Sequence, residues 1–295
     1  RTNADTPEDA QQALDFGAEG IGLFRIEHMF YGKNSETPLA LLRKMILSGS
    51  TEERKKWLNE LHLHIKQSVK GTMKVMDKKP VTFRLIDPPL HEFVPHTKDK
   101  IDLLANELNI NSAELEDRIE VLNEVNPMMG LRGVRLGVIY PEISETQFRA
   151  LFETEAELRK EGFDPHLEIM IPLTVSVTEL KNQKEICDKV HAEVEKAMNA
   201  KIAYMYGTMI EIPRATLVAD EIAEVADFFS FGTNDLTQMT FGFSRDDVNA
   251  IIHEYQSKKI LPADPFQTLD QEGVGQLVKL GVEKGRSSKA SLKIG

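Results

Sequence analysis

Two carboxylates, each at the end of an apolar run, have the spacing in this chain that best suits metal chemistry. Glu211 ends a run that begins at Gly207, and Asp235 follows a run that begins at Phe229. If both runs are parallel strands, the two side chains leave neighbouring strand ends, where carboxylate oxygens suit a hard divalent ion such as Mg2+. The same carboxylates could instead cap helices that open at Pro213 and Asp235, and the spacing alone does not separate these interpretations.

Arginines stand beside three further strand-like runs. They are Arg25, Arg84 and Arg132, and a fourth candidate, Arg245, follows the Asp235 loop. A guanidinium group binds phosphate or carboxylate through two parallel hydrogen bonds. Each arginine alone could be a partner in a surface ion pair. Several of them beside two carboxylates predict a pocket for a small, multiply charged anion.

The elements that must position these residues alternate between strand and helix patterns. Eight strand-like runs are predicted, at residues 1–4, 20–24, 81–85, 133–136, 167–171, 203–212, 228–231 and 291–295. The clearest helical patterns are at 51–76, 143–161, 177–198 and 270–284, and Thr6 is expected to cap another helix with Pro7 at its first position. Eight such units favour an α/β fold, a TIM-type (β/α)8 barrel, over an open doubly wound sheet.

Two segments do not fit the repeating unit. Residues 30–50 are loop-like and then amphipathic, and residues 87–126 are expected to hold inserted helices at 101–108 and 113–125. No linker divides the chain, so residues 1–295 are expected to form a single domain. The last apolar run stops at Gly295, so the barrel is expected to be truncated in its eighth unit.

Composition excludes several classes of partner. The 295 residues include 36 Lys and Arg against 47 Asp and Glu, a net charge of −11, which argues against nucleic acid or an anionic membrane. Cys187 is the only cysteine, so no disulfide framework can form within the chain, and its helical pattern predicts a packed thiol. No apolar run reaches eighteen residues and no signal peptide is evident, so a cytoplasmic location is expected.

Five runs resemble the C-terminal domain of the pyruvate, phosphate dikinases, a branch of the phosphoenolpyruvate-utilising enzyme family. The runs are residues 20–30, 83–93, 126–133, 207–213 and 229–247, and the resemblance covers essentially the whole chain. Phosphoenolpyruvate synthase and enzyme I of the sugar phosphotransferase system share the arginines and the Thr-Asn-Asp-Leu-Thr-Gln core. The Asp-Pro-Pro-Leu-His-Glu-Phe and Phe-Gly-Phe-Ser-Arg-Asp-Asp runs are similar to the dikinases specifically.

The resemblance implies a barrel that binds phosphoenolpyruvate or pyruvate with Mg2+ and exchanges a phosphoryl group with a phosphohistidine on another domain of the same full-length chain. It implies these roles: catalytic phosphoryl binding by Arg25 and Arg84, further anion contacts by Arg132 and Arg245, Mg2+ ligation by Glu211 and Asp235, and substrate contacts by Gly232, Thr233 and Asn234. It also implies a homodimer.

The sequence departs from the family pattern in two places. Phe24 and Ile26 flank Arg25 where the family usually has Cys and Thr; these larger apolar neighbours could narrow the pocket, but they are expected only to repack the strand. The family's proton-donating cysteine lies in a Cys-Gly-Glu-His motif that would follow Gly295, and residues 1–295 are expected to contain no part of an ATP-binding or a phosphohistidine domain. The chain alone is therefore expected to bind substrate and metal without completing turnover. A phosphoenolpyruvate synthase barrel and a non-catalytic dimerisation module remain alternatives.

Overall fold

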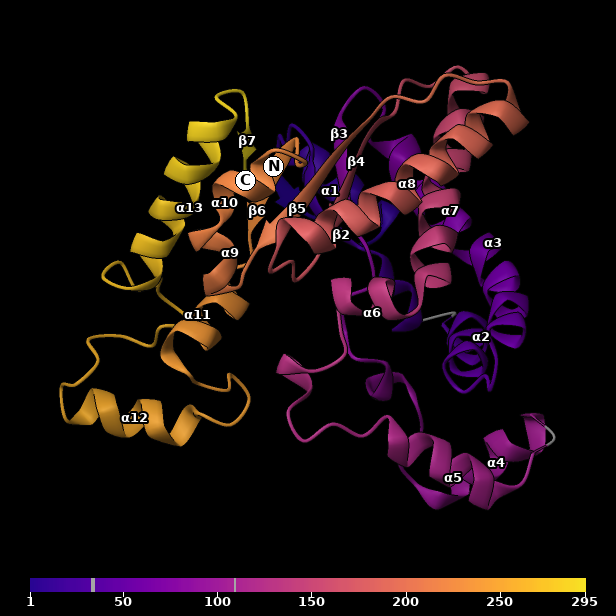
Figure 1. Cartoon of the computed structure of the whole chain (residues 1–295), viewed down its shortest axis with the longest axis horizontal. Helices are drawn as coiled ribbons and strands as arrows, with labels where there is room; N and C mark the ends of the chain where they lie inside the picture. The colour runs from indigo at the N-terminus through magenta and orange to yellow at the C-terminus, as the bar shows by residue number, and fades with distance from the viewer. Residues whose placement is uncertain (33–34, 109) are drawn as a thin grey trace. The chain divides into compact units, whose positions relative to one another are not determined.

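The computed structural model describes residues 1–32, 35–108 and 110–295, and its central element is a parallel sheet (Figure 1). The strands are β1 Thr2–Asn3, β2 Ile21–Arg25, β3 Pro80–Arg84, β4 His166–Ile171, β5 Tyr204–Ile210, β6 Phe228–Phe231 and β7 Lys293–Ile294. Their order in the sheet is their order in the chain, and the β1–β2, β2–β3, β5–β6 and β6–β7 pairs are parallel. Sequential parallel strands joined by helices confirm the predicted α/β, TIM-type fold class.

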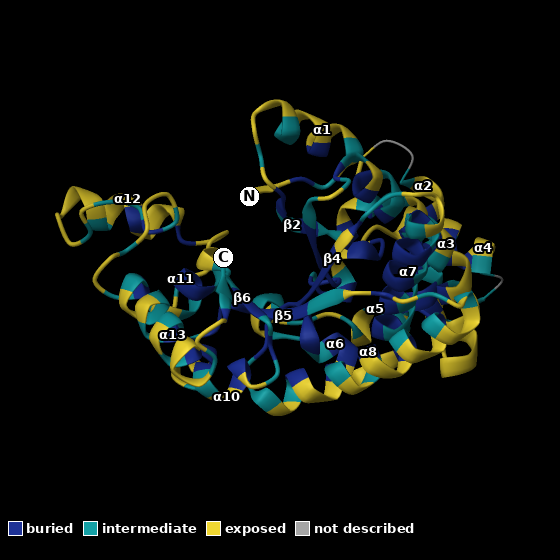
Figure 2. Cartoon of the chain, turned by 90° about the horizontal axis from the view of Figure 1, so that it is seen from above, coloured by how far each residue is buried: buried dark blue, intermediate teal, exposed yellow. Residues whose placement is uncertain are grey.

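The strands form because their residues are apolar and buried over most of their length. Strand β4 is buried from Leu167 onward, and β5 from Tyr206 onward, as the dark strands of Figure 2 show. Continuous burial is typical of strands that are covered on both faces. Within the β5–β6 pair Gly207 is opposite Phe228, and a Cβ on Gly207 would lie 2.5 Å from the Phe228 ring. Only glycine therefore allows this strand pair to pack as it does.

Helices occupy the connections between the strands. They are α1 Pro7–Asp15, α2 Glu36–Ile46, α3 Thr51–Val75, α4 Lys98–Leu108, α5 Ser112–Val121, α6 Val134–Ile139, α7 Pro141–Lys160, α8 Val177–Met198, α9 Pro213–Leu217, α10 Ala219–Ala223, α11 Thr233–Phe241, α12 Asn249–Ser257 and α13 Val274–Ser288, with short 3-10 turns η1 Ile26–Phe30, η2 Leu90–Phe93 and η3 Pro127–Met129. Thr6 caps α1 as predicted, because its hydroxyl accepts a hydrogen bond from the Asp9 N–H over 3.1 Å. The inserted helices are confirmed as α4 and α5.

The predicted strand at residues 133–136 is wrong. The backbone of Gly133 has φ of +58°, its N–H donates to the Asp87 carbonyl over 3.0 Å, and α6 starts at the next residue. The apolar run from Val134 to Ile139 is short, and such a run cannot be assigned to strand or helix by periodicity. The described residues therefore contain seven strands rather than the eight predicted.

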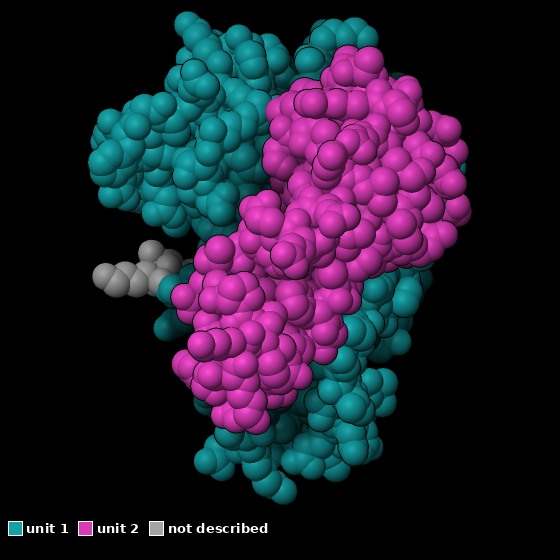
Figure 3. Space-filling model, turned by 90° about the vertical axis from the view of Figure 1, so that its left-hand side faces the viewer, with its two compact units in different colours: residues 1–168, 185–204 teal, residues 169–184, 205–295 magenta. Residues whose placement is uncertain are grey.

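The described chain divides into two compact units, which Figure 3 distinguishes by colour. The first comprises residues 1–168 and 185–204, and the second comprises residues 169–184 and 205–295. Whether residues 1–295 behave as one domain stays a prediction. Among the described helices, none is both long enough and apolar enough to cross a membrane.

In the first unit, helices α3 and α7 pack along each other and are joined by a ladder of ion pairs. Lys66 contacts Glu153 at 2.9 Å and Glu157 at 2.6 Å, Lys70 contacts Glu157 at 2.9 Å and Glu161 at 2.6 Å, and Lys74 contacts Glu161 at 2.7 Å. Successive members are four residues apart on each helix, so they lie on one face. This α3–α7 ladder supplements the burial of apolar residues such as Leu61 and Ile65.

In the second unit, small residues let α13 approach strand β6 closely. A Cβ on Gly281 would lie 3.1 Å from the Phe231 ring, and a Cβ on Gly285 would lie 2.7 Å from the rings and methyl groups of Phe229 and Leu292. Larger residues at either position would push the helix away from the strand. The two glycines thus determine how closely α13 packs against the part of the sheet that contains β6.

Candidate functional site

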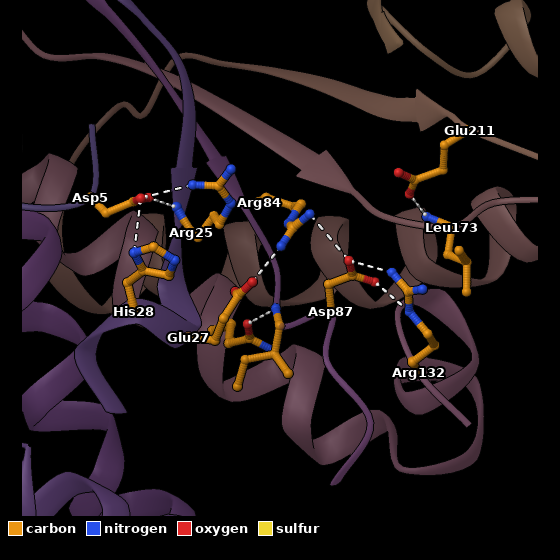
Figure 4. A network of polar contacts seen from close by, with 11 residues as sticks. Asp5, Arg25, Glu27, His28, Arg84, Asp87, Arg132, Leu173 and Glu211 are labelled. Carbon is orange, nitrogen blue, oxygen red and sulfur yellow. Dashed lines mark hydrogen bonds and ion pairs between the residues drawn. The ribbon is translucent and has the colours of Figure 1, made fainter. Parts of the chain in front are cut away.

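Arg25, at the end of β2, is held by Asp5, which lies just before α1 (Figure 4). Arg25 Nη1 donates to Asp5 Oδ2 over 2.9 Å, and the Arg25 backbone N–H donates to Asp5 Oδ1 over 2.8 Å. His28 Nδ1 lies 2.9 Å from the same Oδ2. The Arg25 side chain is 29% exposed, against 12% for Asp5. A nearly buried carboxylate therefore fixes a guanidinium that is still partly accessible to an anion.

The residues that flank Arg25 belong to the core. Phe24 and Ile26 are 1% and 2% exposed, and the Phe24 ring centroid lies 4.9 Å from that of Phe83. Phe24 thus packs against the neighbouring strand, and the effect of the two side chains on the pocket stays a prediction.

Arg84, at the end of β3, is paired with Glu27 in the interior of the first unit. Arg84 Nη2 donates to Glu27 Oε1, and the two residues are 9% and 2% exposed. Burial raises the pKa of Glu27 against the attraction of Arg84. The sequence interpretation did not select Glu27, although it lies two residues after Arg25 within the same recognised run.

Asp87 joins Arg84 to Arg132. Its Oδ2 lies 3.1 Å from Arg84 Nη1 and accepts from Arg132 Nη2 over 2.8 Å, while its Oδ1 accepts from Arg132 Nε over 3.3 Å. Asp87 and Arg132 are each 4% exposed. The Asp87 carbonyl also accepts the N–H of Gly133, which fixes the loop that contains Arg132. Asp87 was within a recognised run but had not been selected as a site residue.

The three arginines of the first unit are therefore paired with three carboxylates. Asp5 contacts Arg25, Glu27 contacts Arg84, and Asp87 contacts both Arg84 and Arg132. For Arg84 and Arg132, the interpretation as surface ion pairs is wrong, because both are buried. Charged donors that are already fixed by internal partners need little reorganisation when an anion arrives. We refer to Arg25, Arg84 and Arg132 with these carboxylates as the arginine array.

In the second unit, Glu211 follows β5 and is 1% exposed. Its Oε1 accepts a 2.7 Å hydrogen bond from the backbone N–H of Leu173, which Figure 4 also shows. Leu173 has φ of +61°, a left-handed conformation that is costly for a residue with a Cβ. The nearby helix α9 has Ile212 as its N-cap and no side-chain capping bond. The observed hydrogen bond of Glu211 thus orients the carboxylate toward the loop after β4 and does not cap α9.

Gly232 lies directly against Glu211. A Cβ at residue 232 would lie 2.2 Å from Glu211 Oε2 and 2.7 Å from Glu211 Cβ, so only glycine leaves space for this carboxylate. Helix α11 begins at the next residue, with exposed Thr233 and Asn234 and with Asp235, which is half-buried, in its first turn. An acidic residue in the first turn of a helix interacts favourably with the helix dipole. The alternative that Asp235 serves to stabilise the start of this helix therefore stays open.

Arg245 lies in the connection between α11 and α12 and is exposed. Its backbone N–H donates to Gln238 Oε1 over 2.8 Å, which ties the connection to α11. Within the residues that the structure describes, its guanidinium forms no ion pair. Its predicted anion contact stays a prediction.

The donor set of the second unit fits a magnesium ion. Mg2+ is held by one or two carboxylates together with water and substrate oxygens, and Glu211 and Asp235 supply two carboxylates. Over the described ranges, no three His, Cys, Asp or Glu side chains gather to hold a metal. Because residue 232 is glycine, no Cβ there occupies the position 2.2 Å from Glu211 Oε2. Cys187 is fully buried, in agreement with the predicted packed thiol, and is no part of this set.

Comparison with known proteins identifies the family of the chain. The family model described as "PEP-utilising enzyme, PEP-binding domain" matches residues 1–292. The chain is 51% identical over 296 residues to pyruvate, phosphate dikinase of Clostridium symbiosum, covering 100% of this chain and 34% of that protein. It is 50% identical over 297 residues to the chloroplastic pyruvate, phosphate dikinase of Mesembryanthemum crystallinum, covering 99% of this chain and 31% of that protein.

A third relative gives the same result. Pyruvate, phosphate dikinase of Giardia intestinalis is 49% identical over 295 residues, covering 100% of this chain and 33% of that protein. The chain thus spans about a third of the length of the curated relatives it matches. Because the family model covers nearly every residue, this chain belongs to the phosphoenolpyruvate-binding domain family of the phosphoenolpyruvate-utilising enzymes.

Proposed function

We propose that this chain binds phosphoenolpyruvate or pyruvate with Mg2+ and serves phosphoryl transfer between pyruvate and a phosphohistidine on another domain, as part of a pyruvate, phosphate dikinase. The observation that carries the proposal is the arginine array, in which Arg25 and Arg84 at strand ends and Arg132 in the loop before α6 are held by internal carboxylates. The identity of about 50% to dikinases over the whole chain supports it.

The arginines would act on the transferring phosphoryl group. In the direction of phosphoenolpyruvate synthesis, the P–N bond of the phosphohistidine breaks and a P–O bond forms to the enolate oxygen of pyruvate. The charge on the moving group is spread over its oxygens, so positioning and charge neutralisation are the main demands on the protein. Arg25 and Arg84 would donate to those oxygens, and Arg132 and Arg245 would add further anion contacts.

The second unit would supply the metal ligands and the contacts to the organic part of the substrate. Glu211 and Asp235 would hold Mg2+, which when bound supplies positive charge that stabilises an enolate. The Leu173 N–H keeps the Glu211 carboxylate oriented. Asn234 would donate a hydrogen bond to the substrate carboxylate, with Gly232 and Thr233 beside it.

The proposal also covers turnover, the distinction from a phosphoenolpyruvate synthase, the oligomeric state and the location. Without the family's proton-donating cysteine, this stretch alone would bind substrate without turnover. A requirement for inorganic phosphate in the protein at its natural full length would favour a dikinase over a phosphoenolpyruvate synthase. We also propose that the protein forms a homodimer and is located in the cytoplasm.

Calorimetric titration with oxalate, an analogue of the pyruvate enolate, tests the proposal. We expect binding that requires Mg2+ and that disappears in a Glu211→Ala/Asp235→Ala variant. Glu254→Ala removes an exposed carboxylate from α12 and is the matched control, with unchanged binding expected. Oxalate binding that is independent of Mg2+, or that survives in the double variant, would refute the assigned metal ligands. Absence of any binding to folded protein would refute the proposed function.

A further inference from the structure

Asp5 occupies a position that the proposed mechanism does not use. It lies in the connection between β1 and α1, before the cap residue Thr6, and its side chain is 12% exposed. The connection is itself fixed, because the Ala4 N–H donates to the Leu23 carbonyl over 3.2 Å and the Asp5 N–H donates to Asp9 Oδ2 over 3.3 Å. The carboxylate is therefore presented from a rigid support.

Both oxygens of Asp5 are directed at the strand end that contains Arg25 (Figure 4). Oδ1 accepts the Arg25 backbone N–H over 2.8 Å, and Oδ2 accepts from Arg25 Nη1 over 2.9 Å. One carboxylate thus determines where the main chain ends its strand and where the guanidinium lies. An arginine side chain has four rotatable bonds, and a fixed partner reduces the entropy that is lost when it binds an anion.

His28 shares this carboxylate. Its Nδ1 lies 2.9 Å from Asp5 Oδ2, the same oxygen that accepts from Arg25 Nη1. The shared oxygen couples the direction of the imidazole to the direction of the guanidinium. Arg25 and His28, which are the more exposed members at 29% and 43%, are therefore both oriented by a less exposed acid.

We propose that Asp5 is a positioning residue that holds the Arg25 guanidinium in the orientation needed to bind the phosphoryl group of phosphoenolpyruvate. The inference rests on the proposed function, since it assigns a purpose to the orientation of Arg25. Asp5 does not touch the substrate in this scheme and acts only through Arg25. It follows that Asp5 matters for a ligand with a phosphoryl group and not for one without it.

The test compares two ligands in the protein expressed at its natural full length. Asp5→Asn keeps the size and one acceptor oxygen but removes the charge. We expect its Kd for phosphoenolpyruvate to rise by about tenfold, which corresponds to the loss of roughly one charge-assisted hydrogen bond. Its Kd for oxalate, which has no phosphoryl group, should stay within about twofold, because the contact at issue is made only to a phosphoryl group. Asp15→Asn, an exposed acid on α1 that bonds Gln11, is the matched control and should change neither constant.

A double-mutant cycle with Arg25→Ala separates positioning from a general structural role. If Asp5 acts through Arg25, Asp5→Asn will not change phosphoenolpyruvate affinity further once Arg25 is replaced. Equal weakening of both ligands, or an effect that persists in the Arg25→Ala background, would overturn the inference. So would an unchanged phosphoenolpyruvate Kd in a protein whose binding does depend on Arg25. If the unmodified protein binds neither ligand, the proposed function itself fails.

Discussion

Replacement of Gly232 by alanine tests the proposed metal ligand Glu211 of the second unit with a single methyl group. The added Cβ would lie 2.2 Å from Glu211 Oε2, 2.7 Å from Glu211 Cβ and 3.0 Å from Met209 Cε. Non-bonded heavy atoms pack at about 3.5 Å, so the carboxylate must move by about 1 Å. The movement is opposed by the 2.7 Å hydrogen bond between Glu211 Oε1 and the Leu173 N–H. A shift of that size would lengthen the bond beyond hydrogen-bond range.

The cost of this substitution has two parts. Overpacking against the buried Glu211 side chain costs about 1–3 kcal/mol, and loss of its hydrogen bond costs about 1–3 kcal/mol more. We therefore expect Gly232→Ala to reduce the free energy of unfolding by about 2–6 kcal/mol. Displacement of a proposed metal ligand by about 1 Å should also weaken Mg2+-dependent oxalate binding by about a hundredfold.

Urea denaturation and calorimetric titration measure the two effects separately. Gly49→Ala is the matched control, because its nearest neighbour would be the flexible Arg118 side chain at 3.5 Å and nothing need move. In a Glu211→Ala background the contact with Oε2 no longer exists, so part of the destabilisation caused by Gly232→Ala should disappear.

Two results would refute this reasoning. Unchanged stability and unchanged oxalate binding in Gly232→Ala would show that Glu211 does not need its observed position. Equal destabilisation in the presence and absence of the Glu211 side chain would show that the carboxylate is not the group displaced.

Three smaller effects follow from the first unit. Burial would raise the pKa of Glu153, but the close contacts of His62 and Lys66 lower it from 4.5 to about 2, so its contribution to stability is complete above pH 4.5 and lost as the pH falls toward 2. Glu153→Gln should therefore flatten the loss of stability between pH 4.5 and 2, as followed by thermal unfolding across pH, and an unaltered pH profile would contradict this. Lys70→Ala removes one step of the α3–α7 ladder and should cost less than about 1 kcal/mol, with a smaller effect in high salt; a loss independent of salt in denaturant titrations would argue against an ionic cause. Thr6→Ala removes the α1 cap and should cost about 1 kcal/mol, whereas Thr6→Ser should cost little; equal losses in the two variants would exclude the hydroxyl as the cause.

Local signals explain why most elements could be predicted. The Thr6-Pro7 pair started α1 as expected, and the strands that end at Arg25, at Arg84 and just before Glu211 appeared within a few residues of their predicted positions. The strand prediction for residues 133–136 failed because a short apolar run fits either a strand or a helix. The outcome there depended on Gly133, which donates to the Asp87 carbonyl, a contact across 46 positions of sequence.

The partners of the arginines could not be predicted in the same way. Arg25 and Arg84 stood out by residue type and position, but Asp5, Glu27 and Asp87 looked like ordinary acids among 47. Their importance depends on burial and direction, which a linear pattern does not report. The strained backbone of Leu173, which holds Glu211, had no sequence signal either, because leucine rarely adopts a positive φ.

By itself, the sequence determined the fold class, the family and the chemical types of the candidate site, because apolar periodicity and residue chemistry are properties of short stretches. Only the tertiary structure decided which carboxylate holds which arginine and which side chains are buried. Those outcomes depend on contacts between residues as distant as Arg25 and Asp5, Arg84 and Glu27, or Glu211 and Leu173. A hydrogen bond or an ion pair is set by distance and direction in space, and folding, not spacing along the chain, fixes both.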